Sequence, residues 1–196
     1  MPLRAPKSAI ELAAKSAEEI KQAAEDNRSD EKRLVDAMYA RQQIDPDCTM
    51  DFLLISGGGD KGAFGTGFLL GWSTVAPGTG AFPKFQGVSG VSAGAVIAPF
   101  AFLGTNADLA AADDISRNPK PDWMVSRGIF FFLPENVSLA TVPGLERDLR
   151  SKIHLEFAKR IELAGSDNRI LLIQATNIDT GNGIEFDFVA AARNAV

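Results

Sequence analysis

The chain has 196 residues, which suits one domain or one domain with an extension, and 45% of them are hydrophobic, enough for a buried core. Its net charge of −5 argues against nucleic acid as the main partner. Its single cysteine, Cys48, excludes an internal disulfide framework and is expected to be a free structural thiol.

Two observations concern the cellular location. Residues 1–7 lack the apolar core of a secretory signal, and no apolar run reaches the ~18 residues that a membrane-spanning helix needs. The cytoplasm is therefore the default expectation. A secreted effector that is exported without a cleavable signal would have the same features.

Residues 1–50 are predicted to form a helical extension that carries no chemistry of its own. Residues 8–25 are rich in helix formers, and Ser29 or Asp30 can cap a second helix, which ends at Asp45–Asp47 around a proline. Packing against the following domain is the favoured interpretation. Docking to a partner or a membrane is the alternative.

The next domain begins with the continuous apolar run 52–56, which is typical of a buried parallel strand. The glycine-rich sequence Gly57-Gly58-Gly59-Asp60-Lys61-Gly62 follows it directly and leads into a predicted helix over 63–74. Consecutive backbone N–H groups in such a loop can bind an anion. For a serine nucleophile, this anion would be the tetrahedral oxyanion of acyl transfer.

A second strand is predicted over 85–89, after a loop at Pro77–Gly80, and it runs into Gly90-Val91-Ser92-Ala93-Gly94 and a helix over 93–103. This is the G-x-S-x-G pattern of a nucleophile elbow. Side chains two positions from Ser92 would collide with the facing strand and helix, which explains the two glycines. Because both loops follow neighbouring parallel strands, we expect them at the same edge of the sheet.

The rest of the chain continues the alternation of helices and strands. We predict short helical pieces in 106–122, one or two helices in 143–163, a strand over 171–175, and a hairpin over 178–187 that turns at Asn182-Gly183. The predicted fold is α/β, with a mainly parallel sheet and helices on both faces. The apolar stretch Gly128–Pro134 is interpreted as a buried strand or anchored loop, with an acyl-chain pocket or lid as the alternative.

The glycine-rich loop and the elbow together resemble the patatin-like phospholipases, over a catalytic domain that would span residues 51–196. The resemblance implies a lipid acyl hydrolase with a Ser-Asp dyad and neither a catalytic histidine nor a metal or other cofactor. Its nucleophile corresponds to Ser92, its oxyanion glycines to Gly57, Gly58 and Gly59, and the basic residue of its loop to Lys61. The implied partners are lipid or phospholipid acyl esters; peripheral membrane contact and the oligomeric state are left open.

The family's catalytic aspartate, which lies in an Asp-Gly motif, has no counterpart here, because no aspartate is followed by glycine. We therefore expect a domain truncated at its C-terminus, with poor activity and an exposed apolar edge. Alternatively, Asp60 or Asp179 substitutes, or the chain is a non-enzymatic scaffold. A carboxylate at Asp60 would oppose the oxyanion electrostatically, and Asp179 has no motif around it.

Three other functions fit the sequence less well. Gly57, Gly59 and Gly62 also match a dinucleotide-binding loop, but the second strand ends without the acidic residue that holds a ribose, and no P-loop lysine follows Gly62. A Ser-His-Asp hydrolase would need His154, the only histidine, together with Asp122 or Asp148. His154 lies in a helix-like stretch, where a surface or capping role is favoured. The sequence Asp179–Gly183 lacks the alternating oxygen ligands of a calcium loop, so no metal site is predicted.

Overall fold

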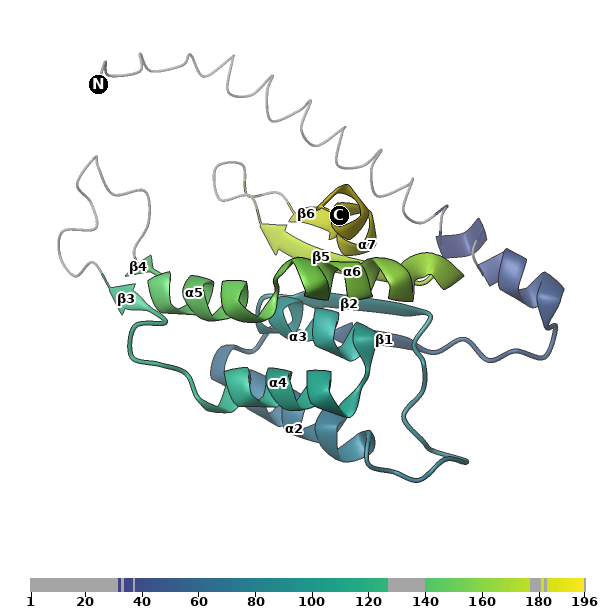
Figure 1. Cartoon of the computed structure of the whole chain (residues 1–196), viewed down its shortest axis with the longest axis horizontal. Helices are drawn as coiled ribbons and strands as arrows, with labels where there is room; N and C mark the ends of the chain where they lie inside the picture. Colours follow the sequence, from purple (N-terminus) through teal and green to yellow (C-terminus); the bar gives the residue numbers. More distant parts are fainter. Residues whose placement is uncertain are drawn as a thin grey trace, which may run out of the picture.

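The computed structural model describes residues 32, 34–36, 38–126, 140–176, 181 and 183–195 (Figure 1). Its main sheet has the order β1 (Phe52–Ile55), β2 (Gly87–Val91), β5 (Ile170–Thr176) and β6 (Gly183–Asp187). The first three strands are parallel, and β6 pairs antiparallel with β5. The α/β class and the mainly parallel sheet are therefore confirmed.

The helices follow the strands in the predicted alternation, and a two-stranded ribbon lies beside them. Their bounds are η1 (Gly59–Lys61), α2 (Gly62–Trp72), α3 (Ala93–Leu103), α4 (Asn106–Arg117), α5 (Pro143–Lys152), α6 (Leu155–Ala164), η3 (Gly165–Asp167) and α7 (Phe188–Ala195), with the ribbon made of β3 (Val125–Ser126) and β4 (Ala140–Thr141). Residues 34–36 and 38–44 are also helical, within the second predicted N-terminal helix. The stretch Gly128–Pro134 and Asn182 lie outside the described residues. The hairpin predicted within 178–187 is wrong, because Gly183 begins β6 and pairs with Thr176, so the partner strand of β6 is the longer β5.

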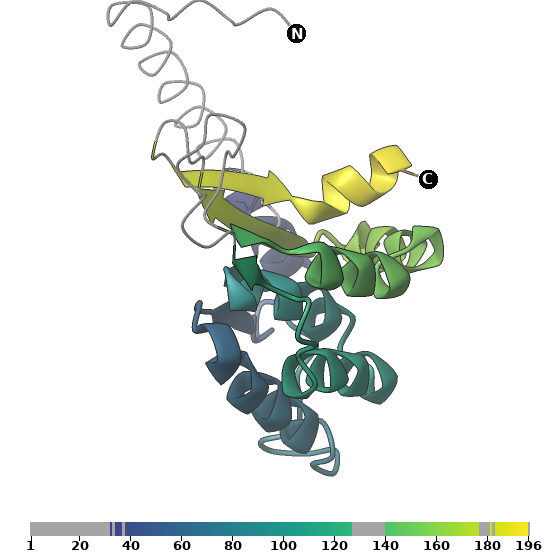
Figure 2. The same cartoon turned by 90° about the vertical axis from the view of Figure 1, so that its left-hand side faces the viewer.

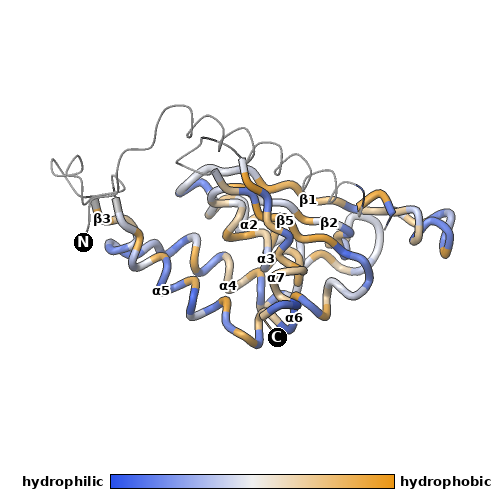
Figure 3. The backbone as a smooth tube through the Cα atoms, turned by 90° about the horizontal axis from the view of Figure 1, so that it is seen from above, coloured by the Kyte–Doolittle hydropathy of each residue, from blue (hydrophilic) through white to orange (hydrophobic). Residues whose placement is uncertain are grey.

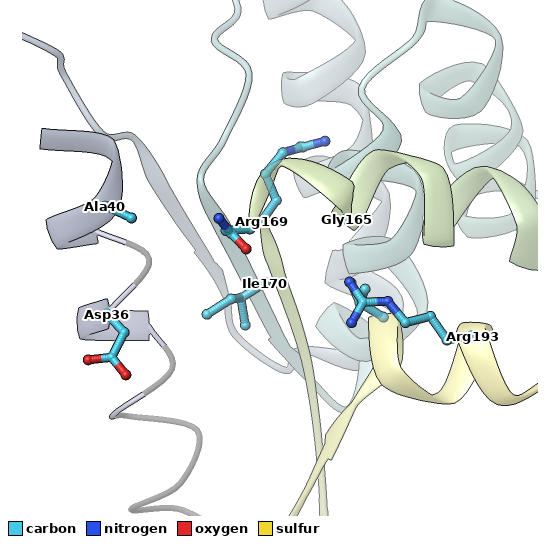
Figure 4. A pocket seen from close by; sticks show the side chains of 8 residues that line it. Asp36, Ala40, Gly165, Arg169, Ile170 and Arg193 are labelled. Atoms are coloured by element: carbon cyan, nitrogen blue, oxygen red, sulfur yellow. The ribbon is translucent and has the colours of Figure 1, made fainter. Parts of the chain in front are cut away.

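Helices α2 to α7 lie on one face of the sheet, as Figure 3 shows from above, whereas helices on both faces were predicted. The strand order explains this placement, because β1, β2 and β5 step in one direction and right-handed crossovers then put their connecting helices on the same side. The N-terminal helix approaches from the other side, at the start of β5 (Figure 4). It leaves much of that face open, since Leu54 on β1 is 79% exposed.

The core lies between the sheet and α3, the most thoroughly buried helix. All residues of α3 from Ile97 to Phe102 are buried, and they pack with Val88 and Leu171 of the sheet and with Phe157 of α6. A helix that is apolar on all sides requires such surroundings. The sheet and its neighbouring helices thereby hold α3 in place, and the N-terminus of α3 carries Ser92.

Arg169, at the start of β5, holds the opposite end of α3. Its buried guanidinium donates hydrogen bonds to the carbonyl oxygens of Phe85 at 2.7 Å and Phe102 at 2.6 Å, and lies 4.1 Å from the centroid of the Phe102 ring. Burial lowers the pKa of Arg169 to about 10, so it stays cationic at neutral pH. Side chains of Arg169, Ile170 and Arg193 line a pocket at this end (Figure 4). The pocket lies where β5 begins, whereas Ser92 lies where β2 ends.

Helix α2 contains four glycines, and one of them is free of packing constraints. A Cβ atom added at Gly71 would meet nothing within 4 Å, whereas one at Gly67 would lie 2.6 Å from Nη2 of Arg117. We expect Gly71→Ala to raise the free energy of unfolding by about 0.5–1 kcal/mol, because glycine is a poor helix former. Urea denaturation measures this change. Gly67→Ala is the control and should gain less, and a loss of stability for Gly71→Ala would contradict the open surface.

Candidate active site

The structure brings the two predicted loops together at one edge of the sheet. Strands β1 and β2 pair in parallel from Phe52–Gly87 to Ile55–Gly90, so the loops that follow them emerge side by side. Gly57 lies directly against the serine, since a Cβ atom added there would be 3.0 Å from the Cβ and 3.5 Å from the Oγ of Ser92. The glycine loop therefore borders the space around the Ser92 hydroxyl.

Ser92 has the strained backbone that a nucleophile elbow requires. Its φ of 56° and ψ of −121° place it outside the regions that side-chain-bearing residues prefer, and it caps the N-terminus of α3. Its side chain is exposed. The helix N-terminus favours negative charge that develops next to the serine.

The glycines on either side of Ser92 are required by close contacts. A Cβ atom at Gly90 would lie 2.2 Å from the carbonyl oxygen of Gly94, and one at Gly94 would lie 2.1 Å from the carbonyl oxygen of Ile55. Gly90 therefore faces the helix and Gly94 faces the first strand, which confirms the predicted steric reason for both glycines. Between them, Val91 is exposed and Ala93 is half-buried.

The glycine-rich loop is anchored at both of its ends. Gly57 abuts Ser92, and a Cβ atom at Gly62 would be 3.5 Å from the Cβ of Ala93. Between them, Gly59 has a φ of 57°, which favours glycine, and the N–H of Lys61 donates to the carbonyl oxygen of Gly58 at 3.1 Å. The side chain of Lys61 is exposed and makes neither an ion pair nor a hydrogen bond with any described residue.

A carboxylate partner for the serine is not found in the described part of the chain. The Oγ of Ser92 makes no hydrogen bond to any described residue, including Asp60, which is exposed in η1. Asp179 lies outside the described residues. The structure therefore brings together the predicted nucleophile and the predicted anion-binding loop and leaves the base of the dyad unassigned.

The groups needed for a Ser-His-Asp triad are not assembled among the described residues. His154 is the exposed N-cap residue of α6, and its side chain makes no capping hydrogen bond. Asp122 accepts a hydrogen bond from Arg147 at 2.7 Å, which lowers its pKa. Asp148 accepts hydrogen bonds from Trp123 at 2.8 Å and Lys120 at 2.9 Å. Both carboxylates are thus held by other partners, and the surface position favoured for His154 is the observed one.

His154 should be dispensable for hydrolysis. We expect His154→Asn to leave turnover of an acyl ester within a few-fold of the unmodified chain, because no described group connects the imidazole to Ser92. Steady-state kinetics with one ester at several pH values measures this. A loss of about 10⁴, the scale of a broken triad, would contradict the dyad and favour the triad.

Asp148 should make the protein sensitive to acid. Hydrogen bonds from Trp123 and Lys120 lower its pKa to about 2, so its ionised form stabilises the fold above the unfolded pKa, and this stabilisation is lost as the pH falls from about 4 to about 2. We expect Asp148→Asn to flatten the dependence of the unfolding midpoint on pH in this range. Asp114→Asn, on the exposed side of α4, serves as the control and should leave most of that dependence in place.

The comparisons with known proteins address the same part of the chain. A model of the patatin-like phospholipase family matches residues 53–190, a range that contains both loops and the four strands of the main sheet apart from Phe52, the first residue of β1. Searches of curated proteins and of solved structures gave no match. Among the described residues, no helix is long and apolar enough to cross a membrane, and no three potential metal ligands cluster. The family match covers well over half of the chain, and the chain therefore belongs to the patatin-like phospholipases.

Proposed function

We propose that this chain is a serine acyl hydrolase acting on fatty-acyl esters of lipids, with Ser92 as its nucleophile. One observation carries the proposal: the strained serine of the elbow lies directly against Gly57 of an anion-binding loop. Membership of a lipid acyl hydrolase family supports the same reaction class. A nucleophile and an oxyanion site in contact are the two parts that acyl transfer needs first.

The reaction would proceed in two steps. The Oγ of Ser92 attacks the ester carbonyl carbon, and backbone N–H groups of Gly57, Gly58 and Gly59 stabilise the oxyanion. Collapse of the intermediate breaks the ester C–O bond, the alcohol leaves with a proton, and the acyl group stays on Ser92. Water then hydrolyses the acyl-enzyme. A carboxylate would accept the Ser92 proton and later activate that water.

Lys61 has a separate role in this proposal. Its exposed ammonium lies three residues after Gly58 on the same loop and makes no ion pair with a described residue. It would raise the positive potential around the entrance, which suits an anionic phospholipid head group.

The carboxylate that would accept the Ser92 proton is unassigned, and this raises a second candidate function. Because no described carboxylate contacts Ser92 and no Asp-Gly pair occurs, activated esters would acylate Ser92 faster than the chain releases fatty acid from phospholipids. The second candidate, a non-enzymatic patatin-like scaffold, rests on the same missing contact. In a scaffold, the Ser92 hydroxyl would not react with an activated phosphonate at all.

Covalent labelling tests the two candidates. The full chain is treated with a fluorophosphonate probe, and the modified residue is located by mass spectrometry. We expect one adduct, on Ser92, and release of p-nitrophenol from a short-chain ester. Formate should increase this release if it takes the role of a carboxylate beside Ser92, and it should have no effect on Ser92→Ala. A chain without an adduct on Ser92 and without ester turnover would be a scaffold.

A further inference from the structure

Helix α2 has an unusual outer face. Phe64 and Phe68 are 80% and 60% exposed, although both belong to the apolar run that the sequence would place in a core. Because they are four residues apart, they lie above one another on the same side of the helix. Helix α2 lies at the outer margin of the molecule in two perpendicular views (Figures 1 and 2).

The other side of α2 accounts for its packing. Thr66 and Leu69 are buried, and Thr66 donates a hydrogen bond to Asp113 of α4 at 3.1 Å. Gly62 approaches α3, where an added Cβ atom would be 3.6 Å from Cδ1 of Ile97. The helix therefore uses its small and buried residues for internal contacts and turns both phenylalanines away from them.

A shallow groove of about 420 Å³ continues the exposed face. Its lining residues are Gly67, Phe68, Gly71, Trp72 and Val75. Trp72 is held in position, because its Nε1 donates to the carbonyl oxygen of Gly80 at 2.8 Å and its ring meets the Phe82 ring edge-on at 5.2 Å. The aromatic wall of the groove is thus fixed, and the glycines leave room in front of it. We refer to Phe64, Phe68 and this groove as the outer face of α2.

The outer face of α2 begins at the candidate active site. Phe64 is in the first turn of α2, directly after the glycine-rich loop, and Gly62 packs against Ala93, the residue after Ser92. Lys61 precedes the helix, and no charged residue occurs between Lys61 and Lys84. A cation therefore stands at the end nearest the serine. The segment beyond it carries no charge of its own, and the ion pair of Arg117 with Asp113 borders it at Gly67.

The two hydroxyls at the C-terminal end of α2 already make hydrogen bonds within the chain. The hydroxyl of Ser73 donates to the carbonyl oxygen of Leu70, and that of Thr74 to the carbonyl oxygen of Gly71, both at 2.7 Å. Protein interfaces usually carry about one hydrogen bond per 100–200 Å² and a polar rim. A lipid surface requires neither, and it combines apolar chains with head groups that Lys61 can attract.

We propose that the outer face of α2 rests on an anionic lipid surface and thereby presents the Ser92 site to it. This inference extends the proposed lipid acyl hydrolase function and rests on it. Phe64 and Phe68 enter the region between head groups and acyl chains, the groove admits acyl-chain segments, and Lys61 meets a lipid phosphate. The first turn of α2 then places the glycine-rich loop at the level of the ester bonds.

Vesicle binding tests the contact without relying on hydrolysis. The full chain in a Ser92→Ala background is mixed with vesicles of phosphatidylcholine and phosphatidylglycerol, and the bound fraction is measured by flotation. We expect Phe64→Ser combined with Phe68→Ser to weaken binding by about tenfold or more, from the loss of two buried aromatic rings. Leu163→Ser is the matched control, because Leu163 on α6 is 74% exposed, and it should bind as the Ser92→Ala parent does. Lys61→Gln should weaken binding only where phosphatidylglycerol is present.

Tryptophan quenching provides a second readout. Brominated acyl chains should quench the fluorescence of Trp72 in vesicle-bound protein, and Trp72→Phe should remove this quenching. Equal vesicle binding by the double phenylalanine variant and the parent, or equal weakening by Leu163→Ser, would overturn the proposal. Absence of vesicle binding by the parent would overturn it as well. A different result would refute the proposed reaction alone: Ser92 would not be labelled, while vesicle binding through α2 would persist.

Discussion

Replacing Ser92 with alanine should abolish labelling by a fluorophosphonate and remove the ester hydrolysis that the chain supports. Loss of a serine nucleophile lowers turnover by up to about 10⁶ in a complete serine hydrolase. The geometry supports Ser92 as this nucleophile, because the elbow exposes it beside Gly57. Mass spectrometry and ester turnover measure the two effects. Undiminished hydrolysis by Ser92→Ala would refute the enzyme proposal.

The same position offers a test of backbone strain. Ser92→Ala keeps the Cβ atom at a φ of 56° and a ψ of −121°, whereas Ser92→Gly removes it. Strain of this kind costs about 1–3 kcal/mol, and the greater chain entropy of glycine offsets about 0.5–1 kcal/mol of the relief. The glycine variant should therefore be more stable than the alanine variant by about 1 kcal/mol in urea denaturation, while both are inactive. Equal stability would mean that the elbow is not strained.

The arrangement of the site could be predicted from the sequence because both loops follow strands of one parallel sheet. The apolar run 52–56 identified β1, the strand-to-helix pattern of the elbow identified β2, and chain order placed their carboxyl ends together. The second strand was predicted over 85–89 and is observed at Gly87–Val91, since pairing with β1 extends to Gly90 and pairing with β5 extends to Val91, the residue before Ser92. The predicted start at residue 85 was two residues too early, because the continuous pairing begins at Gly87. Gln86 still makes a hydrogen bond beside β1, since its N–H donates to the carbonyl oxygen of Asp51 at 2.7 Å.

Two features could not be predicted, because they depend on tertiary contacts. The apolar run of α2 has no alternation of polar residues to mark an outer side, so the exposure of Phe64 and Phe68 appears only once α3 and α4 occupy the inner side. Arg169 is a charged residue in a position that sequence reasoning assigns to the surface. Its burial follows from backbone carbonyl oxygens at the end of α3 and before β2, which come together only in the fold.

The second large effect is expected for Gly94→Ala. The new Cβ atom would lie 2.1 Å from the carbonyl oxygen of Ile55 and 2.8 Å from that of Ser56. Both contacts are with backbone, which cannot rotate away as a side chain can, so β1 and α3 would have to separate. Overpacking of a fitted interior costs about 1–3 kcal/mol and occasionally more, and we expect Gly94→Ala to reach or exceed the upper end of this range.

The displacement should also reach the candidate active site, because Ile55 and Ser56 lead directly into the Gly57 loop. We expect Gly94→Ala to lose labelling at Ser92 even under conditions where circular dichroism shows a folded chain. Gly62→Ala is the matched control, because its Cβ atom would meet Ala93 at an ordinary contact distance of 3.5 Å, on the same helix–loop interface. If Gly94→Ala unfolded at the same urea concentration as the parent and labelled at the same rate, the close approach between α3 and β1 would not exist. If Gly62→Ala lost as much labelling as Gly94→Ala, the effect would come from any change at this interface, and the carbonyl contact with Ile55 would not be its cause.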